Sequence, residues 1–181
     1  MSERPNILWI CTDQQRFDPN AMKDIYETLR WLGIKWDEGP DIGGPYGPYV
    51  QSQRLNHYHS VAKRLIMSGH AYYCYCDSNR LERIREYGDG YDRHCRGLSM
   101  KDNDDLQRRG VPSVIRFKVP VDGATSYEDL LLGKIQRQNR DINTDPVLLK
   151  SDGFPTYHLA AIVDDHEMKI SHVLRSQEWI S

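Results

Sequence analysis

The hydrophobic residues near the start of the chain fall first in a continuous run and then at helical spacing. The run at residues 7–10 is typical of a buried strand. Asp18 and Pro19 follow as N-cap and first-turn residues of a helix. Gly33 can end that helix in the left-handed region. The helix's apolar stripe would consist of Met22, Ile25, Leu29 and Leu32.

A second helix is predicted after residues 37–49, a turn-rich loop with four glycines and three prolines. Ser52 is the expected cap of this helix, and Gly69 its expected end. A strand that carries two cysteines, residues 71–76, follows at once. The stripe of the helix would consist of Leu55, Tyr58, Ala62, Leu65 and Ile66.

The remaining pattern predicts an interrupted alternation of strands and helices. Residues 77–110 are charged and helical in parts, with a loop at 87–92, and residues 113–120 alternate like a strand. Residues 145–157 indicate a strand, a turn and a helix start, and another strand is expected at 170–175. This alternation favours an α/β core with a parallel sheet. The middle of the chain, roughly residues 70–140, differs from this alternation, which indicates an inserted module.

Composition and charge narrow the function classes. The 181 residues are 39% hydrophobic and 28% charged, with a net charge of −2, which does not favour a general polyanion binder. Residues 78–118 nevertheless hold ten Lys or Arg against seven Asp or Glu. No apolar run approaches the length of a membrane span, and the start does not resemble a signal peptide. With four cysteines, this predicts a cytoplasmic protein with reduced thiols.

Three of the cysteines are candidate metal ligands. Cys74 and Cys76, two apart on one strand, would present their sulfurs on the same face, and Cys95 follows nineteen residues later. Zinc prefers four N or S ligands, so a fourth is needed from His94 or Tyr91. Three buried thiols without a metal remain the alternative.

Two further polar groups follow in the last third of the chain. Asp164, Asp165 and His166 could form an acid–base or metal site, but consecutive helical residues diverge, which favours solvated charges. Arg175 ends an apolar strand, where an arginine suits bidentate capture of a carboxylate, and a surface salt bridge is the alternative.

Long segments of the chain resemble one family. The segments "LRWLGIKWDEGPDIGGPYGPYVQSQRL", "GHAYYCYC" and "DPVLLKSDGFPTYHLAAIVDDHEMKISHVLRSQEW" are similar to bacterial-type glutamyl-tRNA synthetases of class I, over about residues 12–181. The resemblance implies a Rossmann-like catalytic core, incomplete here, with an inserted α+β module that binds the tRNA acceptor stem. Residues 1–69 would be core, 70–140 the inserted module and 141–181 the return to the core.

The resemblance also implies an activity and its site. Glutamate would be activated with ATP and Mg²⁺ and transferred to tRNA by a monomeric, cytoplasmic enzyme. Tyr157 and Arg175 match the residues that hold glutamate in this family, and Glu178 and Trp179 match those beside the nucleotide. A planar guanidinium suits a carboxylate, in agreement with this role of Arg175.

The chain departs from the family pattern at several positions. Ala161 stands where an asparagine is common, and Ile10 stands where a substrate-contacting glutamate is usual. The "HIGH" and "KMSKS" motifs do not occur in the 181 residues. We therefore expect a catalytic-domain fragment that is inactive by itself. A tRNA-acceptor-binding module without catalysis is the alternative function.

The first residues resemble a second family. "RPNILWICTDQQRFD" is similar to the opening strand of sulfatases, in which the residue matching Asp13 helps to bind a metal. The nucleophile motif of that family does not follow, so a sulfatase-like hydrolase is the less favoured interpretation.

Resemblance also bears on the cysteine cluster. The zinc site of glutamyl-tRNA synthetases uses C-x-C and then C-x-H, and Gly97 replaces the last ligand here. The related glutamyl-queuosine tRNA-Asp synthetases use C-x-C and then Y-x3-C, which Cys74, Cys76, Tyr91 and Cys95 match. The resemblance thus implies a zinc ion at these four residues. Membership of that related group is less favoured, because its members lack the segment "GPDIGGPYGPY", which this chain contains.

Overall fold

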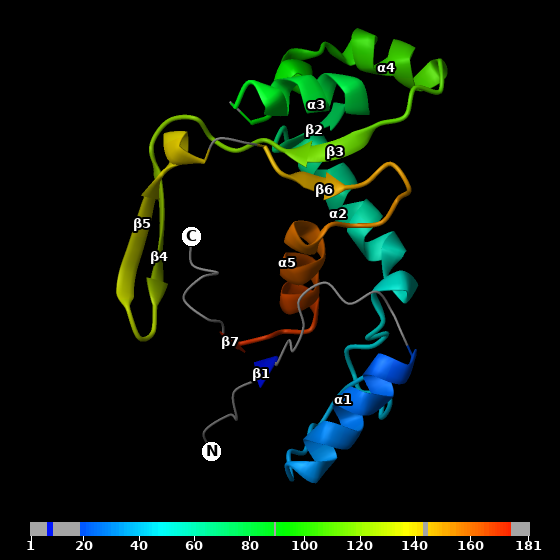
Figure 1. The fold of residues 1–181 in the computed structure, drawn as a ribbon, viewed down its shortest axis with the longest axis vertical. Helices are drawn as coiled ribbons and strands as arrows, with labels where there is room; N and C mark the ends of the chain where they lie inside the picture. Colours follow the sequence, from blue (N-terminus) through cyan, green and yellow to red (C-terminus); the bar gives the residue numbers. More distant parts are fainter. Residues whose placement is uncertain (1–6, 9–18, 89, 143–144, 175–181) are drawn as a thin grey trace. The chain divides into compact units, whose positions relative to one another are not determined.

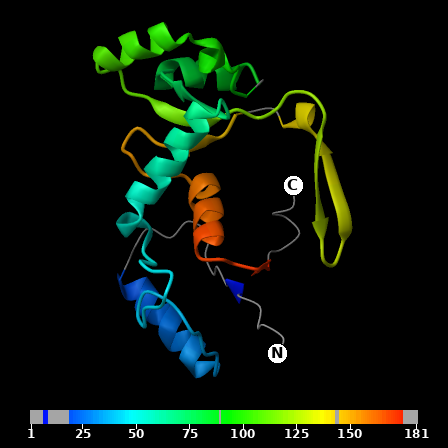
Figure 2. The same cartoon turned by 180° about the vertical axis from the view of Figure 1, so that it is seen from behind.

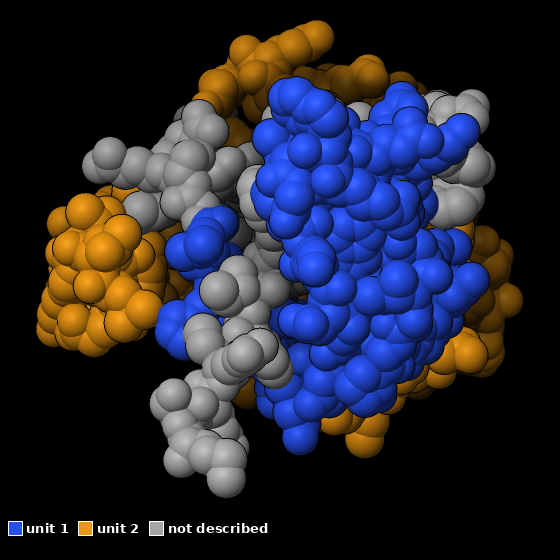
Figure 3. Space-filling view, turned by 90° about the horizontal axis from the view of Figure 1, so that it is seen from below, with its two compact units in different colours: residues 1–54, 164–181 blue, residues 55–163 orange. Residues whose placement is uncertain are grey.

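A computed structural model describes residues 7–8, 19–88, 90–142 and 145–174 of the chain. The chain divides into two compact units (Figure 3), residues 1–54 with 164–181 and residues 55–163. Helices and strands alternate along much of the chain (Figures 1 and 2), as expected for a mixed α/β protein. Within the described ranges, no helix is long and apolar enough to cross a membrane.

The first unit contains the predicted first helix and a parallel strand pair. Helix α1, Pro19–Trp31, lies where the sequence predicts it, and Gly33 adopts a left-handed φ of 72° after it. Strand β1, Ile7–Leu8, pairs in parallel with β7, His172–Val173. Asp18, the expected cap, lies outside the described residues.

The glycine-rich loop of this unit is ordered by side-chain contacts. The Tyr49 hydroxyl donates to the Glu38 carboxylate, and Gly39 pairs with Gly43 as an isolated bridge. Gly44 has a φ of 150°, and a Cβ there would collide with the side chains of Tyr49 and Glu38. The prediction of a turn-rich loop is therefore confirmed, and Gly44 is required by close approach.

The second unit is built on a three-stranded sheet in the order β2–β3–β6, which is antiparallel and not parallel as the alternation predicted. These strands are Ala71–Cys74, Val114–Phe117 and Val147–Leu149. Helix α2, Leu55–Met67, precedes β2, and helix α5, Tyr157–Glu167, follows β6. The expected positions of these strands and helices are confirmed. The predicted Ser52 cap is wrong, because Ser52 lies in a 3-10 turn, Gln51–Gln53, and α2 begins only at Leu55.

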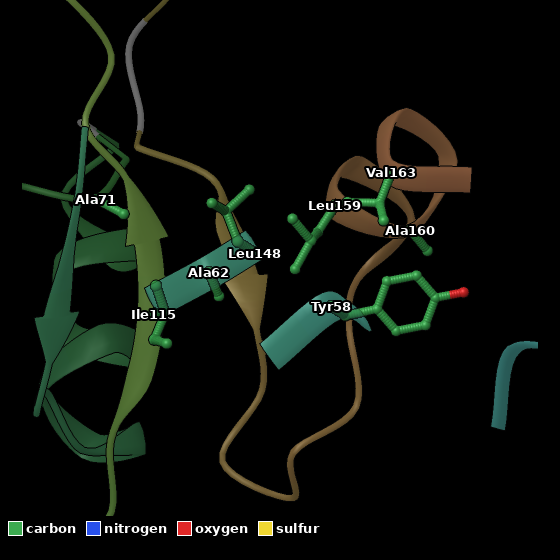
Figure 4. Close-up of a cluster of buried hydrophobic side chains, with 8 residues drawn as sticks. All are labelled: Tyr58, Ala62, Ala71, Ile115, Leu148, Leu159, Ala160 and Val163. Atoms are coloured by element: carbon green, nitrogen blue, oxygen red, sulfur yellow. The ribbon is translucent and has the colours of Figure 1, made fainter. Parts of the chain in front are cut away.

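The apolar core of this unit lies where α2 and α5 pack against the sheet (Figure 4). The helices and strands contribute buried residues to one cluster, and the predicted α2 stripe supplies two of them. The cluster consists of Tyr58, Ala62, Ala71, Ile115, Leu148, Leu159, Ala160 and Val163. Because alternate strand residues point to opposite faces, Tyr72 and Cys74 belong to a second cluster on the other face of β2.

Two short helices and a hairpin complete the second unit. Helices α3, Ser78–Glu86, and α4, Met100–Arg108, each begin with a side-chain cap, from Asp77 and Ser99 respectively. Strands β4, Ala124–Asp129, and β5, Gly133–Gln138, form an antiparallel hairpin whose side chains are mostly exposed. The sequence pattern did not predict this hairpin.

Candidate metal centre

The candidate centre begins at the end of strand β2. Cys74, the last residue of β2, is 2% exposed and points to the same face as Tyr72. Cys76 lies two residues beyond the end of the strand and is half-buried. The expectation that one strand carries both thiols is therefore wrong in detail, because β2 ends at Cys74. The two thiols nevertheless reach the same cluster.

A loop after α3 brings the other two candidate ligands to the strand end. Gly90, with a left-handed φ of 67°, precedes Tyr91, and Cys95 lies in the short 3-10 helix η2, His94–Gly97. Both Tyr91 and Cys95 are buried, at 8% and 4% exposed. The backbone N–H of Cys95 donates to the Tyr91 hydroxyl over 3.3 Å, which fixes the two ligands relative to each other.

The distances between these side chains fit a tetrahedral ion. The Sγ atoms of Cys74, Cys76 and Cys95 all lie within 4.8 Å of one another, and Cys76 Sγ is 3.6 Å from Cys95 Sγ. Zn–S bonds of 2.3 Å in a tetrahedron place sulfurs about 3.8 Å apart. The Tyr91 hydroxyl lies 3.2 Å from Cys74 Sγ and 4.0 Å from Cys76 Sγ. The three sulfurs therefore lie close enough to share one ion, and the Tyr91 hydroxyl lies within 4.0 Å of two of them.

The protonation of the cluster is uneven. Hydrogen bonding with Cys95, and then with Tyr91, lowers the pKa of Cys74 to about 4. Hydrogen bonding with Cys74 raises the pKa of Cys95, and burial raises the pKa values of Tyr91 and Cys76. One thiolate surrounded by proton donors results, and a cation can replace those protons.

His94, the other candidate for the fourth ligand, lies away from the three sulfurs. The His94 side chain is exposed, because neighbouring residues in η2 point apart, and it does not join the three sulfurs. Within the described ranges Cys74, Cys76 and Cys95 are free thiols. Cys11 lies outside the described residues.

The Asp164–His166 group has a different role from the one expected. Asp164 is not a solvated charge, because it accepts a 2.8 Å hydrogen bond from Nε of Arg54, whose side chain is 2% exposed. His166 is exposed, and the described residues hold no metal-type cluster at this position. That the three side chains do not share one ion stays a prediction.

The residues assigned to substrate binding are only partly placed. Tyr157 begins α5, is 43% exposed, and has its ring edge-on to that of His158. Arg175, Glu178 and Trp179 lie outside the described residues, as do Ile10 and Asp13. Their roles stay predictions.

Two residues that the sequence did not indicate surround the cluster. Arg116 is 7% exposed, and its guanidinium carbon lies 3.8 Å from the centroid of the Tyr91 ring. Asp145 is 0% exposed and accepts a hydrogen bond from the Tyr72 hydroxyl. A buried charge requires partners. A charged residue within a predicted strand, such as Arg116, was the one feature of the sequence that could have indicated a buried charge.

Comparison with known proteins gives a consistent result. The family model "tRNA synthetases class I (E and Q), catalytic domain" matches residues 11–181. A glutamate–tRNA ligase of Borrelia duttonii is 59% identical over 176 residues, which cover 94% of this chain and 35% of the relative. A glutamate–tRNA ligase of Treponema pallidum is 50% identical, over 93% of this chain and 36% of the relative. The chain thus spans about a third of the length of these curated relatives.

The chain is also similar to solved structures of glutamate tRNA ligases. A glutamate tRNA ligase from Elizabethkingia meningosepticum, crystallised in complex with its amino acid, superposes with a TM-score of 0.83 at 37% identity. The superposition covers 93% of this chain and 36% of that one. The expected class I catalytic fold is therefore confirmed.

Proposed function

Because the chain belongs to the class I tRNA synthetase family for glutamate and glutamine, we propose that it serves in the attachment of glutamate to tRNA. The observation that carries this proposal is the 59% identity to a glutamate–tRNA ligase over nearly the whole chain. The reaction would consume ATP with Mg²⁺, and tRNA and glutamate would be the partners. A monomeric, cytoplasmic protein fits this role.

The substrate contacts belong to the same proposal. Tyr157 and Arg175 would hold glutamate, and Glu178 and Trp179 would lie beside ATP. Tyr157 lies at the start of α5 and is 43% exposed, which supports contact with a small ligand. The side chains of the inserted module, about residues 70–140, would contact the tRNA acceptor end.

A chimeric ligase tests the activity. Residues 11–181 would replace the matching third of the Borrelia duttonii ligase, which supplies the segments outside the match. We expect glutamate charging of tRNA within about tenfold of the parent ligase. In the same chimera, Arg175→Ala should reduce charging by 100-fold or more, since loss of one electrostatic donor costs about that much. A folded chimera that binds tRNA and does not charge it would favour the non-catalytic binding module.

We also propose that Cys74, Cys76, Tyr91 and Cys95 bind one zinc ion. The support is the donor set: three thiols within 4.8 Å of one another and a phenol hydroxyl 3.2 Å from Cys74 Sγ. With four protein ligands the site is closed, so a bound zinc would have a structural role and cross-link the end of β2 to the loop before α4.

A further inference from the structure

Asp145 is a buried carboxylate two residues before strand β6, and strand β2 supplies one of its hydrogen-bond donors. Its side chain is 0% exposed. The Tyr72 hydroxyl donates to Oδ2 over 2.8 Å, and the backbone N–H of Val119 donates to Oδ1 over 3.1 Å. Tyr72 lies two residues before Cys74 on the same face of β2. The carboxylate is thus tied to the strand that ends in a metal-ligand candidate.

Two arginines reach the same carboxylate from the loop that carries Cys95. Nη1 of Arg96 lies 3.3 Å from Asp145 Oδ1, and Nε of Arg93 lies 3.5 Å from it. Each arginine also donates to a backbone carbonyl, Arg96 to Val119 over 2.8 Å and Arg93 to Ile142 over 3.0 Å. These arginines stand two residues before and one residue after Cys95.

The loop backbone needs such anchors. Arg93 has a left-handed φ of 59°, a conformation that is strained for a residue with a Cβ. Strained conformations of this kind persist only where the surroundings hold them. The guanidinium contacts of Arg93 with Asp145 and Ile142 provide that hold.

Arg116 completes the connection between strand and loop. It lies in β3 opposite Tyr72, and its Nη1 donates to the backbone carbonyl of Asp145 over 2.8 Å. The same guanidinium covers the Tyr91 ring. Asp145 therefore contacts, directly or through one arginine, both sides of the sulfur cluster.

From these contacts we infer that Asp145 is a positioning residue of the metal centre, an inference that rests on the proposed zinc site. Its carboxylate holds the Tyr91–Cys95 loop against the end of β2, so that the four ligands converge before any metal binds. Outer partners that orient metal ligands typically change metal affinity 10-fold to 100-fold when they are replaced. The same effect is expected here.

The test compares Asp145→Asn with Asp141→Asn in the 181-residue chain. Asp141 is the matched control, because its side chain is 67% exposed and its ion-pair partner is the exposed Arg140. Zinc affinity is measured by competition with a chromophoric chelator. We expect Asp145→Asn to weaken zinc binding 10-fold to 100-fold and Asp141→Asn to change it less than twofold. Should Asp145→Asn not fold, Arg96→Gln removes one link and should weaken binding several-fold.

A second measurement needs no metal. In the chelator-treated protein, nuclear Overhauser effects between the Tyr91 ring and the Cys74 β-protons report whether the loop lies against the strand. We expect these effects in the unsubstituted chain and in Asp141→Asn, and their loss in Asp145→Asn.

The outcomes separate the inference from the zinc proposal. If the unsubstituted chain binds no zinc, the metal site is wrong, and the metal-free measurement alone decides the role of Asp145. If it binds zinc, and Asp145→Asn keeps both the affinity and the Overhauser effects, the metal site stands and the positioning role is overturned. A loss of stability alone, with both readouts unchanged, also overturns it.

Discussion

Arg54 buries a full positive charge, and its neighbours are arranged to accept its protons. Its guanidinium donates to Asp164 over 2.8 Å and to Glu167 over 2.7 Å, and to the backbone carbonyl of Pro48 over 3.1 Å. These partners join the glycine-rich loop to the end of α5. At the residue scale, the pair Arg54–Asp164 is a structural contact between positions 110 residues apart.

Replacement of Arg54 should destabilise the protein. Arg54→Ala removes a cation that contacts both carboxylates, and removal of one partner of a buried pair costs about 3–5 kcal/mol. The side chains of Asp164 and Glu167 are 21% and 33% exposed. We therefore expect the free energy of unfolding to fall by about 3 kcal/mol, the lower end of that range. Urea unfolding measures this loss. Arg64→Ala, at an exposed position in the last turn of α2, is the control and should change the midpoint little. Equal midpoints for both variants would contradict the assignment.

The elements differ in how far the sequence predicts them. Helices α2 and α5 and strands β2, β3 and β6 follow from hydrophobic spacing, because each contributes residues to a core cluster. Helix α1 lies where its proline start and its glycine end predict it. The β4–β5 hairpin has exposed side chains on both strands, so no apolar alternation marks it. The cysteine spacing indicated the candidate site, but Arg116 and Asp145 depend on contacts distant in sequence, which no local pattern encodes.

The exposed hairpin should be the least protected sheet of the second unit. An isolated two-stranded hairpin is marginally stable in water, whereas β2 and β3 pack on the core. Hydrogen exchange read by mass spectrometry should therefore show faster exchange in residues 124–138 than in residues 71–74 and 114–117. Equal protection of the two regions in the free chain would contradict this expectation.

The start of α4 should respond to acid. Ser99 and Asp102 form a reciprocal capping box, and hydrogen bonds from Ser99 lower the pKa of Asp102. Because the pKa of Asp102 is lower in the folded state, its carboxylate stabilises the fold at pH values above the unfolded-state pKa of about 3.9. This stabilisation is lost as the pH falls through the pKa of the folded state. An NMR titration of Asp102 should give a midpoint below that value. In Ser99→Ala the midpoint should rise, and an unchanged midpoint would contradict the box.

At the scale of the whole molecule, the proposed inserted module, about residues 70–140, is the region expected to contact tRNA. Exposed basic residues lie on its helices α3 and α4, and this is the region with ten basic against seven acidic residues. They are Arg83, Arg85, Lys101 and Arg108, and the exposed Arg109 follows at the C-cap of α4. Acidic residues on the same helices limit the net charge, so we expect a modest affinity that depends on phosphate contacts.

The affinity for tRNA should fall as salt rises. Each phosphate contact releases condensed counterions, so the logarithm of the affinity decreases linearly with the logarithm of the salt concentration. Fluorescence anisotropy with a labelled acceptor-stem hairpin measures this slope. Lys101→Ala with Arg108→Ala should reduce the slope, and Lys23→Ala in α1 is the control. An affinity independent of salt would contradict phosphate contact by this module.

The most direct test of the account is the zinc content of the purified chain, because the structure gathers three thiols and a phenol that the sequence separates by up to 21 residues. Elemental analysis after expression with added zinc should give about one zinc per chain. Cys74→Ser should lose the metal, and Cys11→Ser, outside the four-ligand set, should retain it. A chain without zinc, or a Cys74→Ser variant that keeps it, would contradict the assignment of this centre.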